Sequence, residues 1–207
     1  MTPFMRLALI VESIGHVFGI RTEKTPSYKL IVQEGHFEVR LYDEYLVAET
    51  MIDDIDNKRA SNIGFNILAA YIFGKNERQQ QINMTAPVLQ KNCTEQIKMA
   101  SPVLQEKTTS GWTMSFIMPS EYDLGTLPKP LDQRIVIRTV QSHLVGVLRY
   151  SGFVSDAIIK NKTALLREWL IAKSYVPIDL AKSARYDPPF TIPFLRKNEI
   201  HLSVKKV

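Results

Sequence analysis

The stretch from Ile82 to Pro119 decides the fold, because it contains a near-repeat and a third segment of the same kind. Met84-Thr-Ala-Pro-Val-Leu-Gln90 returns as Met99-Ala-Ser-Pro-Val-Leu-Gln105, and Trp112-Thr-Met-Ser-Phe-Ile-Met-Pro119 follows. Residues two apart in a β-strand share a face, so each segment predicts a strand with one apolar face. Four of the seven methionines fall on these faces. Because methionine adapts to irregular apolar shapes, they indicate either a core or a groove for a flat apolar ligand.

Pro87 and Pro102 occupy matching positions in the repeat. Proline has no N–H to donate, and inside a strand it normally marks an edge, a bulge or a strand end. The pair therefore predicts a strongly bent sheet, consistent with a barrel whose strands curve.

The chain before this stretch predicts three more strands between Tyr28 and Ile52. In the second of them, Phe37, Val39 and Leu41 alternate with His36, Glu38 and Arg40. This alternation is typical of a sheet with a core on one face and water on the other.

Two helices are predicted from their start and stop signals. Asp53-Asp54-Ile-Asp56 offers an N-cap and a negative first turn to a helix over about 57–73, and Gly74 provides a left-handed end. Ser155 and the following aspartate cap a second helix over about 156–173. The order of hairpin, helix and strands thus occurs twice.

The two copies span about 28–119 and 134–204, and the connection between them carries apolar residues that can pack down. Two pseudo-symmetric halves that share one curved sheet fit this better than two domains. The predicted class is α+β, a distorted antiparallel β-barrel with two helices. Residues 1–27 are expected to form an N-terminal extension with a short amphipathic helix. Its apolar run, Leu7–Val11, is too short to span a bilayer, so we expect a soluble, cytoplasmic protein.

Composition narrows the function. The 207 residues are 45% apolar and carry a net charge of +5, with the basic residues dispersed, which does not favour a nucleic-acid binder. A single cysteine, Cys93, excludes an internal disulfide and a multi-cysteine metal site. The sequence has no phosphate-binding glycine loop, nucleophile elbow or zinc-binding helix motif, so it gives little support to an enzyme.

Several blocks of the sequence resemble the SOUL haem-binding proteins and keep the order found in that family. They are Gly64-Phe65, Tyr71-Ile-Phe-Gly74-Lys-Asn76, Met84-Thr-Ala-Pro-Val88, Phe116-Ile-Met-Pro-Ser120 and Tyr186-Asp-Pro-Pro-Phe190 through Arg196-Lys-Asn-Glu199. The resemblance covers about 28–204 and implies an eight-stranded barrel domain over 28–207. It also implies binding of haem or a related tetrapyrrole in a shallow apolar groove by the first helix, without enzymatic chemistry.

A porphyrin needs a flat apolar wall and cations for its propionates. By this resemblance the first helix and the proline-rich segment supply the wall, with polar edge contacts from two asparagines. The expected cofactor-binding residues are Asn62, Phe65, Asn66, Ala69, Ala70, Phe190, Thr191 and Phe194. Some relatives place basic groups on this helix and in this loop, where the present chain has Ala69, Ala70 and Thr191. Arg59, Lys75 and Arg196 are the candidates to replace them.

Histidine is the usual ligand of haem iron. The four histidines, His16, His36, His143 and His201, lie outside the matching blocks and are expected to be exposed bystanders. Tyr71 and the methionines of the groove remain as weak ligands, and haem held without protein ligation is equally compatible.

Two other functions stay open. The groove would serve another hydrophobic small molecule or a partner peptide, and the missing cations favour this alternative. A hydrolase of amphipathic small molecules, with scattered catalytic residues, is the more distant one.

Overall fold

The structure is a computed structural model, and it describes residues 25–53, 56–92, 111–188 and 190–207. The strands are β1 (Tyr28–Glu34), β2 (Phe37–Tyr42), β3 (Tyr45–Ile52), β4 (Val88–Asn92), β5 (Trp112–Ile117), β6 (Ile135–Val140), β7 (His143–Tyr150), β8 (Tyr175–Pro177), β9 (Lys182–Arg185) and β10 (Asn198–Lys206). The helices are α2 (Asn57–Ile72), α3 (Asp156–Ala172) and the short 3-10 helix η1 (Pro193–Leu195). The expected N-terminal helix lies outside the described residues.

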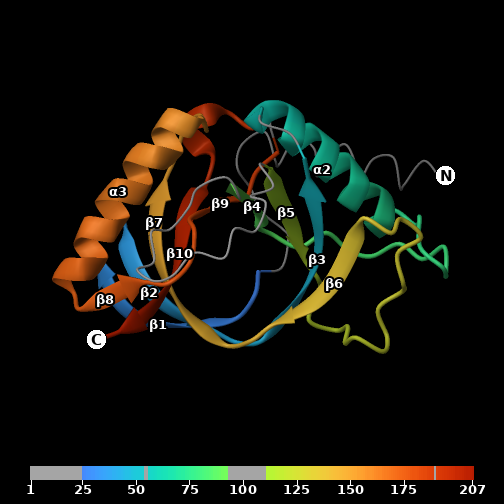
Figure 1. Cartoon of the computed structure of the whole chain (residues 1–207), viewed down its shortest axis with the longest axis horizontal. Coiled ribbons are helices and arrows are strands. Elements are labelled where there is room, and N and C mark those ends of the chain that lie inside the picture. Colours follow the sequence, from blue (N-terminus) through green and yellow to red (C-terminus); the bar gives the residue numbers. More distant parts are fainter. Residues whose placement is uncertain (1–24, 54–55, 93–110, 189) are drawn as a thin grey trace, which may run out of the picture.

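All strands pair antiparallel in one sheet, in the order β1-β2-β7-β10-β9-β4-β5-β3-β6, with β8 beside β10. The sheet curls into a half-barrel, with α3 outside one part of it and α2 outside another (Figure 1). The predicted α+β class is confirmed, with ten strands in the described residues instead of the expected eight. The short strands β8 and β9 account for the difference, because segments of three and four residues carry no readable alternation.

Helix α2 starts and ends where its signals predict. The Asp56 side chain accepts a hydrogen bond from the Arg59 N–H at 2.7 Å, and Gly74 adopts φ +108° just beyond the end. Leu68, Tyr71 and Ile72 are buried against β3 and β5. A Cβ on Gly64 would lie 2.8 Å from Ile52 Cδ1, so glycine permits this close approach.

Helix α3 begins at the Ser155 cap, whose hydroxyl accepts from the Ile158 N–H. Its Leu166 and Leu170 are fully buried above β2, β7 and β10. A Cβ on Gly146 of β7 would lie 2.6 Å from Leu170 Cδ1. Each helix therefore seals its own core cluster, as expected for two similar halves.

The first copy of the repeat, Met84–Gln90, is a β-strand only from Val88 onward. Residues 82–87 form an irregular segment, and β4 begins at Val88, after the Ala86–Pro87 bond. The expected inward face of Met84 is wrong, since this side chain is 37% exposed. Met114 and Met118 are core residues, as predicted. The copy that holds Met99 lies outside the described residues.

The face of β2 that was expected to meet water is buried. Glu38 and Arg40 are 4% and 1% exposed. The sheet curls so far that this face lines the inside of the half-barrel. An alternating pattern shows that a strand has two different faces, but not that the polar face is wet.

Candidate ligand-binding surface

Helix α2 presents part of the expected site at the surface. Asn62, Phe65 and Asn66 are exposed, Ala70 is half-buried and Ala69 is buried. Phe65 is 40% exposed, and its ring meets the buried Phe116 ring edge-on at 5.5 Å between centroids. Phe65 thus rests on the core and offers its other side to a ligand.

The proline-rich segment after β9 contributes the other part. Phe190 and Phe194 are 57% and 72% exposed, whereas Thr191 is buried. Thr191 contributes its carbonyl oxygen, which accepts from Arg196 Nε at 2.8 Å. Two phenyl rings are therefore the groups of this segment that a ligand would meet first.

Hydrogen bonds tie the start of α2 to the end of β9. Ser61 Oγ donates to Gln90 Oε1 at 2.9 Å, and Arg185 Nη2 donates to the same oxygen at 3.2 Å. Ser61 precedes Phe65 by four residues and so lies on the same side of α2. Arg185 is the last residue of β9, directly before the proline-rich segment. The two parts of the expected site therefore approach each other over β4, and Figure 1 shows the segment after β9 passing between α3 and α2 in that view.

Phe153 adds an aromatic ring that the sequence did not single out. It is 66% exposed, and Arg196 Cζ lies 5.5 Å from its ring centroid. The neighbouring Gly152 N–H donates to the Pro193 carbonyl at 2.9 Å. This places Phe153 beside η1, a contact between segments about forty residues apart for which the sequence has no local signal.

The cations expected to replace the family's basic groups lie at three separate places in the structure. Arg196 is engaged by the Thr191 carbonyl and the Phe153 ring. Lys75 lies beyond the far end of α2, roughly 20 Å along the axis from Ser61 at 1.5 Å per residue. Arg59 is exposed in the first turn of α2.

A buried network of charged side chains occupies part of the inside of the half-barrel. Arg40 donates from Nη1 and Nη2 to the two Glu199 carboxylate oxygens, each at 3.0 Å, and from Nε to Glu38 at 2.6 Å. His201 Nε2 lies 2.7 Å from Glu199 Oε2, and the Tyr186 hydroxyl donates to the same carboxylate. Burial alone would raise the pKa of Glu199, but His201 and Arg40 hold it well below its usual value.

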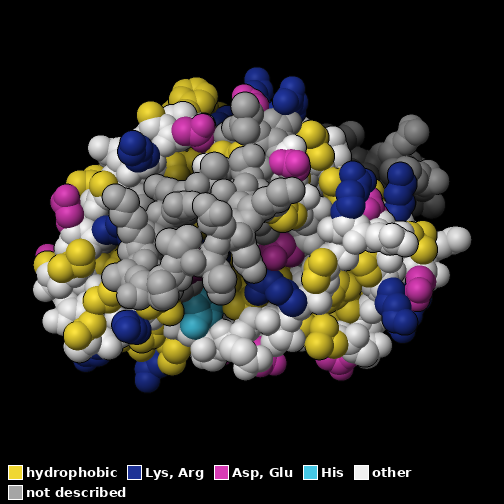
Figure 2. Space-filling view, viewed as in Figure 1, with side chains coloured by type: hydrophobic (Ala, Val, Ile, Leu, Met, Phe, Trp, Pro, Cys, Tyr) yellow, Lys and Arg dark blue, Asp and Glu magenta, His cyan; other side chains and the backbone are white. Residues whose placement is uncertain are grey.

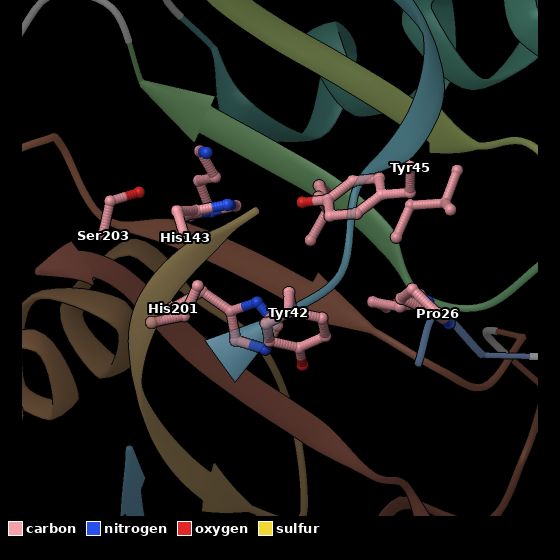
Figure 3. A pocket seen from close by; sticks show the side chains of 11 residues that line it. Pro26, Tyr42, Tyr45, His143, His201 and Ser203 are labelled. Atoms are coloured by element: carbon pink, nitrogen blue, oxygen red, sulfur yellow. The ribbon is translucent and has the colours of Figure 1, made fainter. Parts of the chain in front are cut away.

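The expectation that every histidine is an exposed bystander is wrong for His201. It is 7% exposed, and burial lowers its pKa. His143 is half-buried, and burial lowers its pKa too. Both line a small cavity with Tyr42, Tyr45 and Ser203 (Figure 3). At about 10 Å³ this cavity holds one water at most, so it cannot take a porphyrin.

Tyr71 is also unsuited to bind iron, because it is fully buried and its hydroxyl donates to the Pro128 carbonyl at 2.7 Å. Among the residues that the structure describes, no group of three metal-binding side chains occurs.

A larger cavity of about 630 Å³ opens beside the β2–β3 turn. It is lined by Asp43, Glu44, Asp123, two tyrosines and several apolar side chains, and none of the described residues that line it is Lys, Arg or His. It shares no residue with the expected haem site.

Figure 2 shows one face of the molecule, on which Lys and Arg are scattered among Asp and Glu without forming a stripe. No helix within the described ranges is long and apolar enough to cross a membrane.

Comparisons with known proteins identify the same family as the sequence resemblance. A family model described as "SOUL heme-binding protein" matches residues 23–203. The chain is 31% identical to mouse "Heme-binding protein 2" over 176 residues, which cover 84% of this chain and 80% of that protein. It is 34% identical to the human protein of that name over 134 residues, 65% of this chain and 60% of the relative. The alignment thus spans less than two thirds of the human protein.

Two solved structures share the fold. The C-terminal domain of EcmrR superposes with a TM-score of 0.58 at 13% identity, covering 87% of this chain and 99% of that domain. A hydrolase from Listeria innocua superposes with a TM-score of 0.53 at 12% identity, covering 84% and 94%. At these identities the likeness concerns the architecture alone.

Proposed function

Because the chain belongs to the SOUL heme-binding protein family, we propose that it binds haem or a related tetrapyrrole on the outer surface formed by α2 and residues 186–197. The names of its relatives support haem as the ligand. We further propose that it acts by binding, as a carrier, buffer or sensor, without catalysing a reaction.

The observation that carries this proposal is the set of exposed aromatic rings on α2, on the segment after β9 and on the neighbouring connection between β7 and α3. Phe65, Phe153, Phe190 and Phe194 expose from 40% to 72% of their surface. Folded domains seldom leave several phenyl rings exposed, and such patches commonly mark binding sites. Rings that already rest on the core, as Phe65 does on Phe116, offer a rigid apolar wall.

The residues present fit a tetrapyrrole held mainly by its faces and its carboxylates. Phe65, Phe190 and Phe194 would contact the macrocycle, with Asn62 and Asn66 at its polar edges. His143 and His201 line the inner cavity instead of this surface. We therefore propose that neither of these two histidines ligates the iron.

Phe65→Glu and Phe190→Glu should each weaken haemin binding at least tenfold, because a carboxylate would be desolvated against an apolar macrocycle. The measurement is a haemin titration followed at the Soret band, and one haemin per chain is expected. Leu131→Glu is the matched control, since Leu131 is 63% exposed and belongs to the 120–133 connection. Uptake that fails to saturate, or that is equal in all four proteins, would rule out this site.

The 630 Å³ cavity favours a second candidate, an amphipathic cation. Its volume suits a drug-sized ligand, and Tyr45 and Tyr122 could face a cation beside Asp43 and Glu44. A quaternary ammonium amphiphile should then raise the melting temperature of the wild type, and Glu44→Gln should reduce that rise. No stabilisation by such compounds would remove this candidate.

A further inference from the structure

Arg185 lies in the outer face of the sheet, between the core clusters under the two helices. In the paired strands it stands opposite Val88 of β4 and Asn198 of β10, and Asn198 stands opposite Tyr150 of β7. Directly paired residues share a face. Val88 packs into the cluster under α2 and Tyr150 into the cluster under α3. Arg185 and Asn198 thus separate the two apolar clusters.

Within the described residues, no carboxylate is hydrogen-bonded to the guanidinium of Arg185. Its Nη2 donates to the neutral amide of Gln90 at 3.2 Å. Its Nε is buried and has no hydrogen-bond partner within the described part of the chain. Burial lowers the pKa of Arg185, and the nearby Asp156 and Tyr150 offset part of this without bonding to it.

Arg40 is a buried arginine with a structural role, and it differs from Arg185 in its partners. Arg40 meets two carboxylates, Glu199 and Glu38, through three N–H groups. A buried charge that lacks such partners costs stability. The contrast between Arg40 and Arg185 is therefore a reason to look for an anion that binds Arg185.

The surroundings of Arg185 also contain two buried hydroxyls, Tyr150 Oη and Ser183 Oγ. Within the described residues neither has a partner other than the neighbouring hydroxyl of this pair. Burial raises the pKa of Tyr150, and the interaction with Ser183 offsets part of this rise. Two hydroxyls that share one hydrogen bond still have an O–H to donate, so the site offers a donor besides the guanidinium.

The position of this site matches the surface proposed above. Arg185 directly precedes the segment that carries Phe190 and Phe194, and through Gln90 it connects to Ser61, one turn before Phe65. We propose that Arg185 anchors a carboxylate of the bound ligand, a propionate if the ligand is haem. This inference rests on the proposed function and assigns a cation that the sequence did not identify.

The test compares haemin with its dimethyl ester, which has the same macrocycle but no carboxylates. Arg185→Gln should weaken haemin binding roughly 10- to 100-fold, the usual effect of losing a hydrogen bond to a charged group. It should leave ester binding unchanged. Arg78→Gln is the matched control, because Arg78 lies outside α2 and residues 186–197 and donates to the Thr126 carbonyl. It should not distinguish the two ligands.

Thermal unfolding of the ligand-free proteins gives an independent result. Because Arg185 lacks a carboxylate partner, Arg185→Gln should melt at the wild-type temperature or above it. A large drop would show that Arg185 is structural and would overturn the proposal. So would an equal loss of haemin and ester binding, or no loss of either. If wild-type protein fails to bind haemin saturably, the proposed function itself is wrong, and the two failures are thereby distinguished.

Discussion

At the scale of single residues, the buried polar groups divide into satisfied and unsatisfied ones. Glu199 receives hydrogen bonds from Arg40, Tyr186 and His201, which makes it the centre of the inner network. Within the described residues, the hydrogen-bond partner of Arg185 is an amide. The bonded carboxylate of Glu199 therefore stabilises the fold, whereas we propose that Arg185 binds a ligand.

His201 makes stability depend on pH. Its pKa in the folded protein is lowered by burial, so below about pH 6.5 the unfolded chain takes up a proton that the folded chain does not. Stability should therefore be full above pH 6.5 and fall as the pH decreases, by at most about 1.4 kcal/mol per pH unit for one histidine. Urea unfolding between pH 7.5 and 5 should show a shallower decline for His201→Gln.

His143 should contribute to the same decline, because burial lowers its pKa in the same direction. The double variant with His143→Gln should be flatter still over that range. A decline as steep in the double variant as in the wild type would show that neither histidine is responsible.

Glu199 affects the free energy of unfolding at lower pH than the histidines do. Its folded pKa lies below its usual value, so its contribution is present above about pH 4 and is lost as the pH falls further. Glu199→Gln leaves Arg40 buried with one carboxylate fewer, and we expect a loss of about 3–5 kcal/mol at pH 7. Urea unfolding at pH 7 measures this loss, and a variant within 1 kcal/mol of the wild type would contradict it.

At the scale of elements, the contact of each helix with the sheet depends on a glycine. Gly146→Ala would bring a methyl group to 2.6 Å from the fully buried Leu170, and repacking should cost about 1–3 kcal/mol. Denaturant unfolding measures the loss. Gly125→Ala, in an exposed turn, is the control and should stay within about 0.5 kcal/mol of the wild type. Equal stability of the two variants would mean that α3 can shift freely on β7.

The helices could be predicted from the sequence because their signals are local. Asp56, Gly74 and Ser155 act within one turn of the backbone they cap. The start of β4 could not, since the irregular segment before Val88 carries the same apolar residues as a strand. The short β9 was missed because Lys182–Arg185 shows no alternation, and pairing on both sides holds it in the sheet.

The site was predictable only in part, for a similar reason. Exposed Phe65, Phe190 and Phe194 follow from the family's blocks, which lie along the chain in a readable order. Phe153 and Arg185 lie beside the proposed site through hydrogen bonds of their segments to partners far away in sequence, Pro193 and Gln90. The burial of Arg40 depends on the curl of the whole sheet, which alternation in one strand cannot report.

At the scale of the whole molecule, the half-barrel leaves its ligand few places. The ion network around Arg40 and Glu199 occupies part of the inside, and the cavity beside His201 holds a single water at most. Within the described residues, the outer surface of α2 with residues 186–197 and the open 630 Å³ cavity are the candidate places. We propose that a tetrapyrrole binds at the first, because the exposed rings lie there beside Arg185, whose hydrogen-bond partner is an amide.

Amide hydrogen exchange of the wild-type protein, with and without one equivalent of haemin, tests this placement most directly. With haemin bound, we expect slower exchange in α2 and in residues 186–197, and little change in residues 43–46 and 117–125 around the larger cavity. Protection confined to 43–46 and 117–125, with α2 unaffected, would contradict it and move the ligand into that cavity.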